Sequence, residues 1–245
     1  MPHLPAIQKI DGHRAWPLYS TASTRTIESQ AQAQLPAHTL MQRAGRAAAQ
    51  LALALQPCAD HIWIACGPGN NGGDGFEAAM HLHQWGKRVT VTWLGHEATL
   101  PADAQQSYQR AVQAGVHFQD TPPTDFDLAI DALLGIGCQR SPEGVMASWL
   151  DILYQATVVV LSLDVPSGLM ADTGRWLHAQ TSISATARRH TLSFLSLKPG
   201  LFTADGRDAA GQIWFDNLGV EVPTDIDPTT WLQAAHTSTP TRAHS

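Results

Sequence analysis

Charged residues and cysteines are scarce in this sequence. Only 15% of its 245 residues are charged, the formal net charge is −6, and three residues are cysteines. A mildly acidic chain has no general attraction for nucleic acid, so any phosphate group must be held by local geometry. The hydrophobic content of 44% is typical of a globular protein rather than a disordered one. We therefore expect a globular protein that binds no nucleic acid.

The number and spacing of the cysteines give no sign of a metal site or of a disulfide framework. Cys58, Cys66 and Cys138 form no CxxC pair and are odd in number, which argues against a zinc site and a disulfide framework. Small buried thiols in a reducing compartment are the simpler interpretation. Because no apolar run reaches about 18 residues and the N-terminus lacks a signal-peptide pattern, we expect a cytoplasmic protein with no membrane segment.

Strand-like and helical patterns alternate from residue 61 onward. This alternation predicts an α/β fold, a Rossmann-like three-layer αβα sandwich with a mostly parallel sheet. Two helices precede the alternation, and Ser23 or Thr24 is the expected N-cap of the first. The expected helices are 21–34, 38–55, about 76–85, 101–114 and 145–154; the strands are 61–66, 89–94, 128–134 and 157–163, with edge strands at 190–197 and 212–215. The predicted organisation is an irregular segment at 1–20, one domain at 21–222, and a tail or truncated linker at 223–245.

The most specific motif is the glycine-rich segment 67–75, Gly-Pro-Gly-Asn-Asn-Gly-Gly-Asp-Gly. Its glycines permit positive φ and a close backbone approach, and its N–H groups precede a helix, where anions bind. We therefore predict that it holds the pyrophosphate of a nucleotide-like ligand. The segment is neither GxGxxG nor a P-loop. Asn70, Asn71 and Asp74 add side-chain oxygens that a phosphate cradle does not need.

Two further strands end in polar loops, at 131–141 and 164–168. Asp131 lies within an apolar strand, where a carboxylate is costly unless it is paired, binds a cation or caps the N–H groups of a neighbouring loop. Asp164 follows a buried strand, a position suited to a general acid or base, although Pro-Ser-Gly after it is also a good turn. Asn71, Asp131 and Ser167 are expected at adjacent strand ends. Their oxygens suit a hard cation, and the residues alone leave open potassium, magnesium or no ion.

Five motifs in the same order resemble the YjeF N-terminal domain family, whose characterised members are NAD(P)HX epimerases. The resemblance covers about residues 19–219. It rests on Leu-Met-Gln-Arg-Ala-Gly at 40–45, the glycine-rich segment at 67–75, Asp-Ala-Leu-Leu-Gly-Ile-Gly at 131–137, Asp-Val-Pro-Ser-Gly at 164–168, and Lys-Pro-Gly-Leu at 198–201.

The resemblance implies a homodimer that epimerises NADHX and NADPHX, which are NADH and NADPH hydrated at C6 of the nicotinamide ring. It also implies an ADP-dependent NAD(P)HX dehydratase as a functional partner or fused domain, and one potassium ion per subunit held by Asn71, Asp131 and Ser167. Asp164 would be the catalytic acid–base group. The implied substrate-binding residues are Asn70, Asn71, Gly72, Gly73, Asp74, Gly135, Ile136, Gly137, Cys138, Gln139, Arg140, Ser141 and Asp164.

Two rival functions remain at this stage. A non-catalytic interaction module of the same domain type would tolerate loss of the acid and cation residues, yet Asn71, Asp131 and Asp164 are present. An ordinary NAD(P)-dependent oxidoreductase would need GxGxxG and an acidic residue about 20 positions later, and neither follows the first strand. Ser167 lacks the GxSxG context of an α/β-hydrolase. Lys198 is expected to be solvated. The sequence does not distinguish NADHX from NADPHX.

Overall fold

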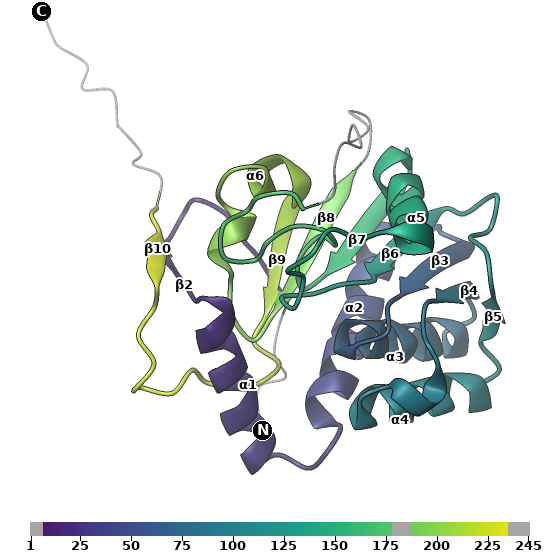
Figure 1. The fold of residues 1–245 in the computed structure, drawn as a ribbon, viewed down its shortest axis with the longest axis horizontal. Helices are drawn as coiled ribbons and strands as arrows, with labels where there is room; N and C mark the ends of the chain where they lie inside the picture. Colours follow the sequence, from purple (N-terminus) through teal and green to yellow (C-terminus); the bar gives the residue numbers. More distant parts are fainter. Residues whose placement is uncertain (1–6, 178–187, 235–245) are drawn as a thin grey trace, which may run out of the picture.

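A computed structural model describes residues 7–177 and 188–234. Eight strands form one sheet in the order β1-β9-β8-β7-β6-β3-β4-β5 (Figure 1). All neighbouring strands are parallel except for β1, which is antiparallel to β9. The strands are β1 Gln8–Lys9, β3 His61–Cys66, β4 Arg88–Trp93, β5 His117–Gln119, β6 Leu128–Ala132, β7 Val159–Leu163, β8 Arg189–Phe194 and β9 Gln212–Asp216.

Helices cover both faces of this sheet. Successive side chains of a strand point to opposite faces, and in β3 Ile62 and Ile64 pack with one group of helices while Trp63 and Ala65 pack with another. The first group comprises α2 Thr39–Leu55, α3 Asn70–Gln84 and α4 Ala102–Gln113, and the opposite face carries α5 Gly144–Gln155. The central strands β3, β6 and β7 are buried throughout, as strands covered on both faces should be. The predicted mostly parallel α/β sandwich is confirmed.

The first helix, α1 Thr21–Gln34, begins one residue after Ser20. The Ser20 side chain accepts a hydrogen bond from the Ser23 backbone N–H at 3.1 Å and is therefore the N-cap. The prediction of Ser23 or Thr24 in that role was wrong, because both residues already lie inside the helix. Thr24 instead packs inward, and its hydroxyl lies 2.7 Å from that of Ser196.

The larger correction concerns α3, which starts at Asn70 rather than at residue 76. Most of the glycine-rich motif is therefore helical. None of its glycines has a positive φ, so the expected left-handed backbone is absent there. The glycines serve close packing instead: a Cβ on Gly72 would lie 2.1 Å from the Gly67 carbonyl oxygen, and one on Gly75 would lie 2.7 Å from Ala132 Cβ and Cys66 Sγ. Packing of α3 against the strands requires this absence of side chains.

The C-terminal strands also differ from prediction. β8 is not an edge strand, because it pairs with β7 on one side and β9 on the other, and β9 in turn is covered by β1. The short strand β2 Trp16–Leu18 pairs with β10 Thr230–Leu232 in a separate two-stranded sheet. These pairings join segments about as far apart as the chain allows, and short strands of two or three residues leave almost no periodic pattern to read. The described residues contain no helix long and apolar enough to cross a membrane.

Candidate functional site

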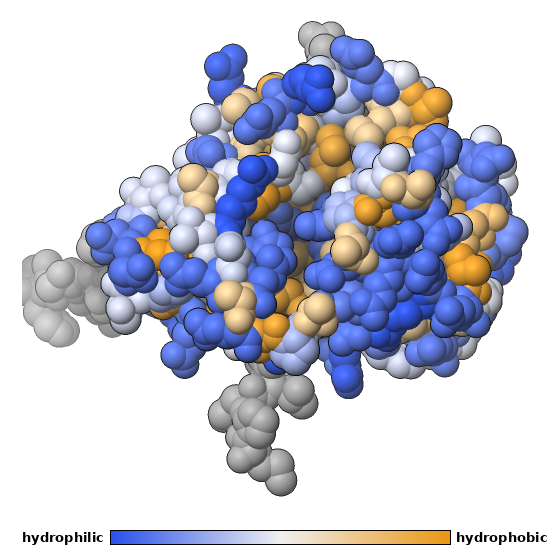
Figure 2. Space-filling view, turned by 60° about the horizontal axis from the view of Figure 1, so that its bottom comes forward, coloured by the Kyte–Doolittle hydropathy of each residue, from blue (hydrophilic) through white to orange (hydrophobic). Residues whose placement is uncertain are grey.

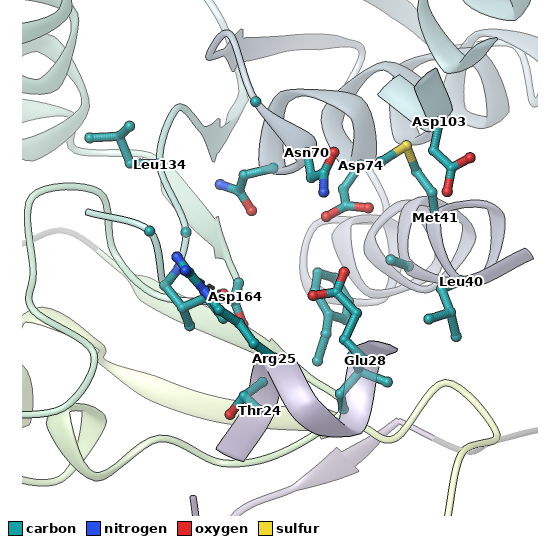
Figure 3. A pocket seen from close by; sticks show the side chains of 18 of the residues that line it. Thr24, Arg25, Glu28, Leu40, Met41, Asn70, Asp74, Asp103, Leu134 and Asp164 are labelled. Atoms are coloured by element: carbon teal, nitrogen blue, oxygen red, sulfur yellow. Dashed lines mark hydrogen bonds between the residues drawn. The ribbon is translucent and has the colours of Figure 1, made fainter. Parts of the chain in front are cut away.

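A pocket of about 470 Å³ lies at the carboxyl ends of the strands, where open parallel sheets bind their ligands. A space-filling view toward the bottom of Figure 1 shows the hollow near the middle of this face (Figure 2). Loops after β6, β7 and β8 line it together with α2 and the start of α3, and α1 lies across the cavity from α3 (Figure 3). The predicted residues that line it are Asn70, Asn71, Asp74, Gly135, Ile136, Gly137 and Asp164.

Asp131 ties the loops after β6 and β7 together. Its carboxylate accepts hydrogen bonds from the Ser167 hydroxyl at 2.5 Å, the Ser167 N–H at 2.9 Å, the Ser162 hydroxyl at 3.2 Å and the Leu133 N–H at 3.3 Å. The Ser167 hydroxyl also accepts from the Leu134 N–H at 2.8 Å. Burial raises the pKa of Asp131, although these hydrogen bonds oppose the effect. The structure thus brings Asp131 and Ser167 into direct contact, below the pocket surface rather than on it.

Asn71 lies apart from that pair, at the first turn of α3. Its side-chain amide borders Gly135, since a Cβ at Gly135 would sit 3.4 Å from Asn71 Oδ1 and 3.0 Å from Asp164 Oδ2. Among the described residues, the buried Asn71 Nδ2 has no hydrogen-bond partner. The amide is therefore not committed to another protein contact. A Cβ at position 135 would crowd both side chains, so glycine lets the loop after β6 pass close to them without displacing either.

Asp164 occupies a constrained position at the end of β7. Its φ of 67° places it in the left-handed region, which is uncommon for a residue with a side chain and occurs often at functional sites. Its Oδ1 accepts a hydrogen bond from Lys198 Nζ at 2.5 Å, and its Oδ2 accepts one from the Ile136 N–H at 3.1 Å. Both carboxylate oxygens are held, and the side chain still lines the pocket. The geometry suits a positioned proton acceptor.

A second carboxyl group, that of Asp74, faces the pocket from α3. Figure 3 shows it pointing across the cavity toward Glu28 of α1. Burial, followed by the negative charges of Asp164 and Glu28, raises the pKa of Asp74 well above its usual value. The pKa of Glu28 is also raised, chiefly by burial. One carboxyl group is thus paired with an ammonium group and another has a raised pKa, an arrangement that suits the first as a proton acceptor and the second as a proton donor.

Several pocket residues were missed by reading the sequence. Lys198 was expected in solvent, yet its side chain is fully buried, and that expectation was wrong. The helix α1 was treated as a polar helix without a role in binding. A periodic pattern says which residues are polar but not that a helix returns to cover the strand ends. Pro68 and Gly69, which belong to the glycine-rich segment predicted to hold a pyrophosphate, also line the pocket. The unpredicted lining residues are Thr24, Arg25, Glu28, Gln32, Leu40, Met41, Ala44, Asp103, Leu133, Leu134, Phe194, Leu195, Lys198 and Leu218.

Some predicted binding residues lie behind the pocket wall. Gly73 packs against Met41 and Ala104, and Cys138 is buried with its thiol 3.7 Å from the Arg140 carbonyl oxygen. Gly72, Gln139, Arg140 and Ser141 likewise do not line the cavity. Their role in substrate binding stays a prediction. The role of Asn71, Asp131 and Ser167 in holding a potassium ion also stays a prediction. Gly72 and Gly73 support the site through packing, because larger residues there would displace α3.

Comparisons with known proteins agree with this architecture. Residues 37–200 match the family model described as YjeF-related protein N-terminus. The bifunctional NAD(P)H-hydrate repair enzyme Nnr of Escherichia coli (strain K12) is 36% identical over 190 residues, which span 76% of this chain and 36% of that protein. The NAD(P)H-hydrate epimerase of Legionella pneumophila (strain Philadelphia 1) is 34% identical over 199 residues, spanning 77% of this chain and 72% of that protein.

A solved structure shares the fold. The crystal structure of yeast ynu0, YNL200c, superposes with a TM-score of 0.65 at 20% identity, covering 79% of this chain and 86% of that one. The fold and its cavity define an α/β protein with a pocket at the carboxyl edge of a parallel sheet. By the extent of the family match, the chain belongs to the YjeF-related protein N-terminus family. It spans 36% of the length of the bifunctional Escherichia coli relative.

Proposed function

We propose that this chain is an NAD(P)H-hydrate epimerase, an isomerase that interconverts the R and S forms of NADHX and NADPHX at C6 of the nicotinamide ring. The observation that carries the proposal is the pocket in which Asp164, paired with Lys198, and Asp74 both reach the cavity. Family membership and the names of relatives such as the Legionella pneumophila epimerase support the choice of reaction.

The reaction needs proton transfer and no redox partner. C6 carries a hydroxyl group and is bonded to the ring nitrogen. If the hydroxyl group takes a proton and leaves as water, the nitrogen lone pair forms an iminium and C6 becomes planar; a water molecule then adds to the opposite face and loses a proton. Asp74, whose pKa is raised chiefly by burial, suits the proton donor. Asp164 suits the acceptor because it is held as a hydrogen-bonded partner of an ammonium group.

The dinucleotide portion of the substrate would bind at the start of α3. The first N–H groups of a helix have no partner within the helix and attract anions, and Asn70 and Asn71 open α3 at the pocket wall. Arg25 adds a basic side chain on the facing helix α1, with its guanidinium 3.8 Å from where a Cβ on Gly137 would lie. The pyrophosphate predicted for the glycine-rich segment would therefore be held between α3, the loop at Gly137, and Arg25.

A potassium ion, one per subunit, is part of the proposal. The chemistry of Asn71, Asp131 and Ser167 fits a hard cation, because each offers an oxygen ligand. The Asn71 amide nitrogen makes no hydrogen bond to a described residue that would fix the orientation of its oxygen. These residues would hold the ion. Once bound, it would supply positive charge that orients the loops after β6 and β7, with the proton transfers left to Asp164 and Asp74.

The assembly and its partner also belong to the proposal. An ADP-dependent NAD(P)HX dehydratase, acting on the S form, would be a separate partner or a fused domain; the fused arrangement is supported by relatives named bifunctional repair enzymes. A homodimer in the cytoplasm is proposed from the family resemblance. Val145 and Ile152 of α5 are large apolar side chains exposed on the surface, which is consistent with a protein contact on that face.

The direct test is chromatography of a mixture of R- and S-NADHX after a dehydratase specific for the S form has been added. With the purified chain present, the R form should disappear much faster than its spontaneous rate of epimerisation allows. Boiled protein is the control. If the R form persists at the spontaneous rate while the dehydratase consumes the S form, the epimerase proposal is wrong and the alternative of an interaction module gains support.

A further inference from the structure

Lys198 is a fully buried lysine at the wall of the candidate site. Its Nζ lies 2.5 Å from Asp164 Oδ1, 2.7 Å from the Phe194 carbonyl oxygen and 3.2 Å from the Ser193 hydroxyl, with 0% of its side chain exposed. An ammonium group has three N–H donors, so these three acceptors use all of them. A buried charge of this kind is costly unless it is paired and hydrogen-bonded. Here it is both.

This arrangement leaves Lys198 no donor for a substrate phosphate. Only two of the described lining residues are basic, Arg25 and Lys198. Arg25 lies exposed at the opening, whereas Lys198 points at the carboxylate of Asp164 from behind. The two positive charges therefore have different roles. Arg25 is placed to contact an anionic ligand, and Lys198 contacts the neighbouring carboxylate of Asp164.

Hydrogen bonds within the preceding turn fix the position of Lys198. The turn between β8 and Lys198 is closed by hydrogen bonds from the Ser196 N–H to the Phe194 carbonyl at 2.6 Å and from the Ser193 hydroxyl to the Ser196 carbonyl at 2.9 Å. Leu195 in this turn has a φ of 62°. The same turn thus supplies the two neutral acceptors of the ammonium group and directs its third N–H toward Asp164.

Lys198 and the Ile136 N–H hold the Asp164 carboxylate from two sides. Lys198 binds Oδ1 and Ile136 binds Oδ2, so rotation of the carboxylate would break one contact or the other. The loop bearing Ile136 and the turn bearing Lys198 follow different strands, β6 and β8, on either side of β7. The orientation of Asp164 in the pocket is therefore set by both neighbours of its own strand.

We propose that Lys198 is a positioning residue that holds the Asp164 carboxylate aimed into the pocket, and that it does not bind the substrate. The inference rests on the proposed epimerase function. If Lys198 acts only through Asp164, removing both residues should lower the rate of epimerisation no further than removing Asp164 alone.

The test is a double-mutant cycle in the epimerase assay with wild type, Lys198→Met, Asp164→Asn and the double variant. Lys198→Met should lower kcat by about 100-fold, the order that a positioned proton-transfer group contributes, with KM changed by less than about 3-fold because uniform binding is untouched. The double variant should match Asp164→Asn. Lys87→Met is the matched control, since Lys87 also donates to backbone carbonyls, of Pro57 and Ala59, but far from the pocket; it should retain wild-type kcat.

A second measurement covers the case in which Lys198→Met is poorly folded. Lys198→Ala should regain activity when ethylammonium is added, and the same cation should not improve Asp164→Asn. A raised KM with unchanged kcat in Lys198→Met would show substrate binding instead and overturn the proposal. So would additive losses in the double variant, or Lys198→Ala that folds yet gains nothing from ethylammonium. An inactive wild type would instead reject the epimerase function on which the inference rests.

Discussion

Two carboxylates of this protein, Glu77 and Asp164, are each paired with a basic residue but occupy different environments. Glu77 is fully buried between α2, α3 and α4, where Arg110 lies 2.9 Å from it and the Ser107 hydroxyl donates to it at 3.1 Å. His38 extends this network through the same hydroxyl at 2.7 Å. Asp164 is paired just as closely with Lys198, but it lines an open pocket. Only the second carboxylate can meet a ligand.

The difference shows that burial and charge pairing alone do not mark a functional site. Burial raises the pKa of Glu77, and Arg110 opposes the shift; yet every group around it belongs to the helical layer. Asp164 adds a left-handed backbone conformation and access to the cavity. Strain is tolerated in proteins where the surrounding structure imposes it, often for function. We infer a stabilising role for Glu77 and a chemical one for Asp164.

The largest effect is expected from Asp164→Asn. An amide cannot take up a proton as a carboxylate does, so epimerisation should slow by about 100- to 10,000-fold. The amide oxygen can still accept a hydrogen bond from Lys198, whereas the amide nitrogen cannot accept one from the Ile136 N–H, so we expect a folded protein with a small loss of stability. The rate of R-NADHX consumption and a thermal melt measure the two effects. A variant as fast as wild type would remove Asp164 from the mechanism.

Glu77→Ala should give the opposite pattern. It removes the partner of Arg110 and Ser107 from a buried position, and we expect a loss of about 2–4 kcal/mol in the free energy of unfolding, because Arg110 is partly exposed and keeps some hydration. Epimerase activity per folded molecule, measured well below the melting temperature, should stay within about 3-fold of wild type. Urea denaturation measures the free energy of unfolding. A Glu77→Ala variant as stable as wild type but with strongly reduced turnover would contradict a stabilising role for Glu77.

Asp74→Asn tests the second carboxyl group of the pocket. If Asp74 donates a proton, its amide replacement should lower kcat by about 10- to 100-fold, less than the loss in Asp164→Asn, since water can supply part of that proton. Asp103→Asn is a suitable control because Asp103 also lines the pocket but has no role in the proposed chemistry. Unchanged kcat in Asp74→Asn would leave Asp74 with a binding role only.

The smallest effect concerns the pH dependence of stability. Burial lowers the pKa of His61 from 6.5, so the folded state binds a proton less tightly than the unfolded chain. The stability that depends on neutral His61 is present above pH 6.5 and is lost as pH falls below that value. The melting temperature of wild type minus that of His61→Asn should therefore shrink between pH 7.5 and about 5.5. His13→Asn, at an exposed position, is the control for the substitution itself. A constant difference for His61→Asn over this pH range would contradict the linkage.

Much of the fold could be predicted because its signals are local. The strand at His61–Cys66 is a short apolar run, the helix starting near Thr39 has clear apolar periodicity, and the strand–helix alternation predicted the parallel sheet. The start of α3 was misplaced because Asn and Gly are weak helix formers, and packing of Gly72 and Gly75 against the strands overrides that weakness. The strands β1, β2 and β10 were missed because their pairing partners are distant in sequence.

Residue order alone sets the α/β class and places Asn71, Asp74, Asp131 and Asp164 near strand ends, because it specifies which side chains follow each strand. The surroundings of the three aspartates, by contrast, arise from the folded structure. It paired Asp131 with Ser167, directed Lys198 at Asp164 and placed Glu28 opposite Asp74. Charge state, burial and access depend on neighbours that lie far away along the chain, and no local pattern specifies them.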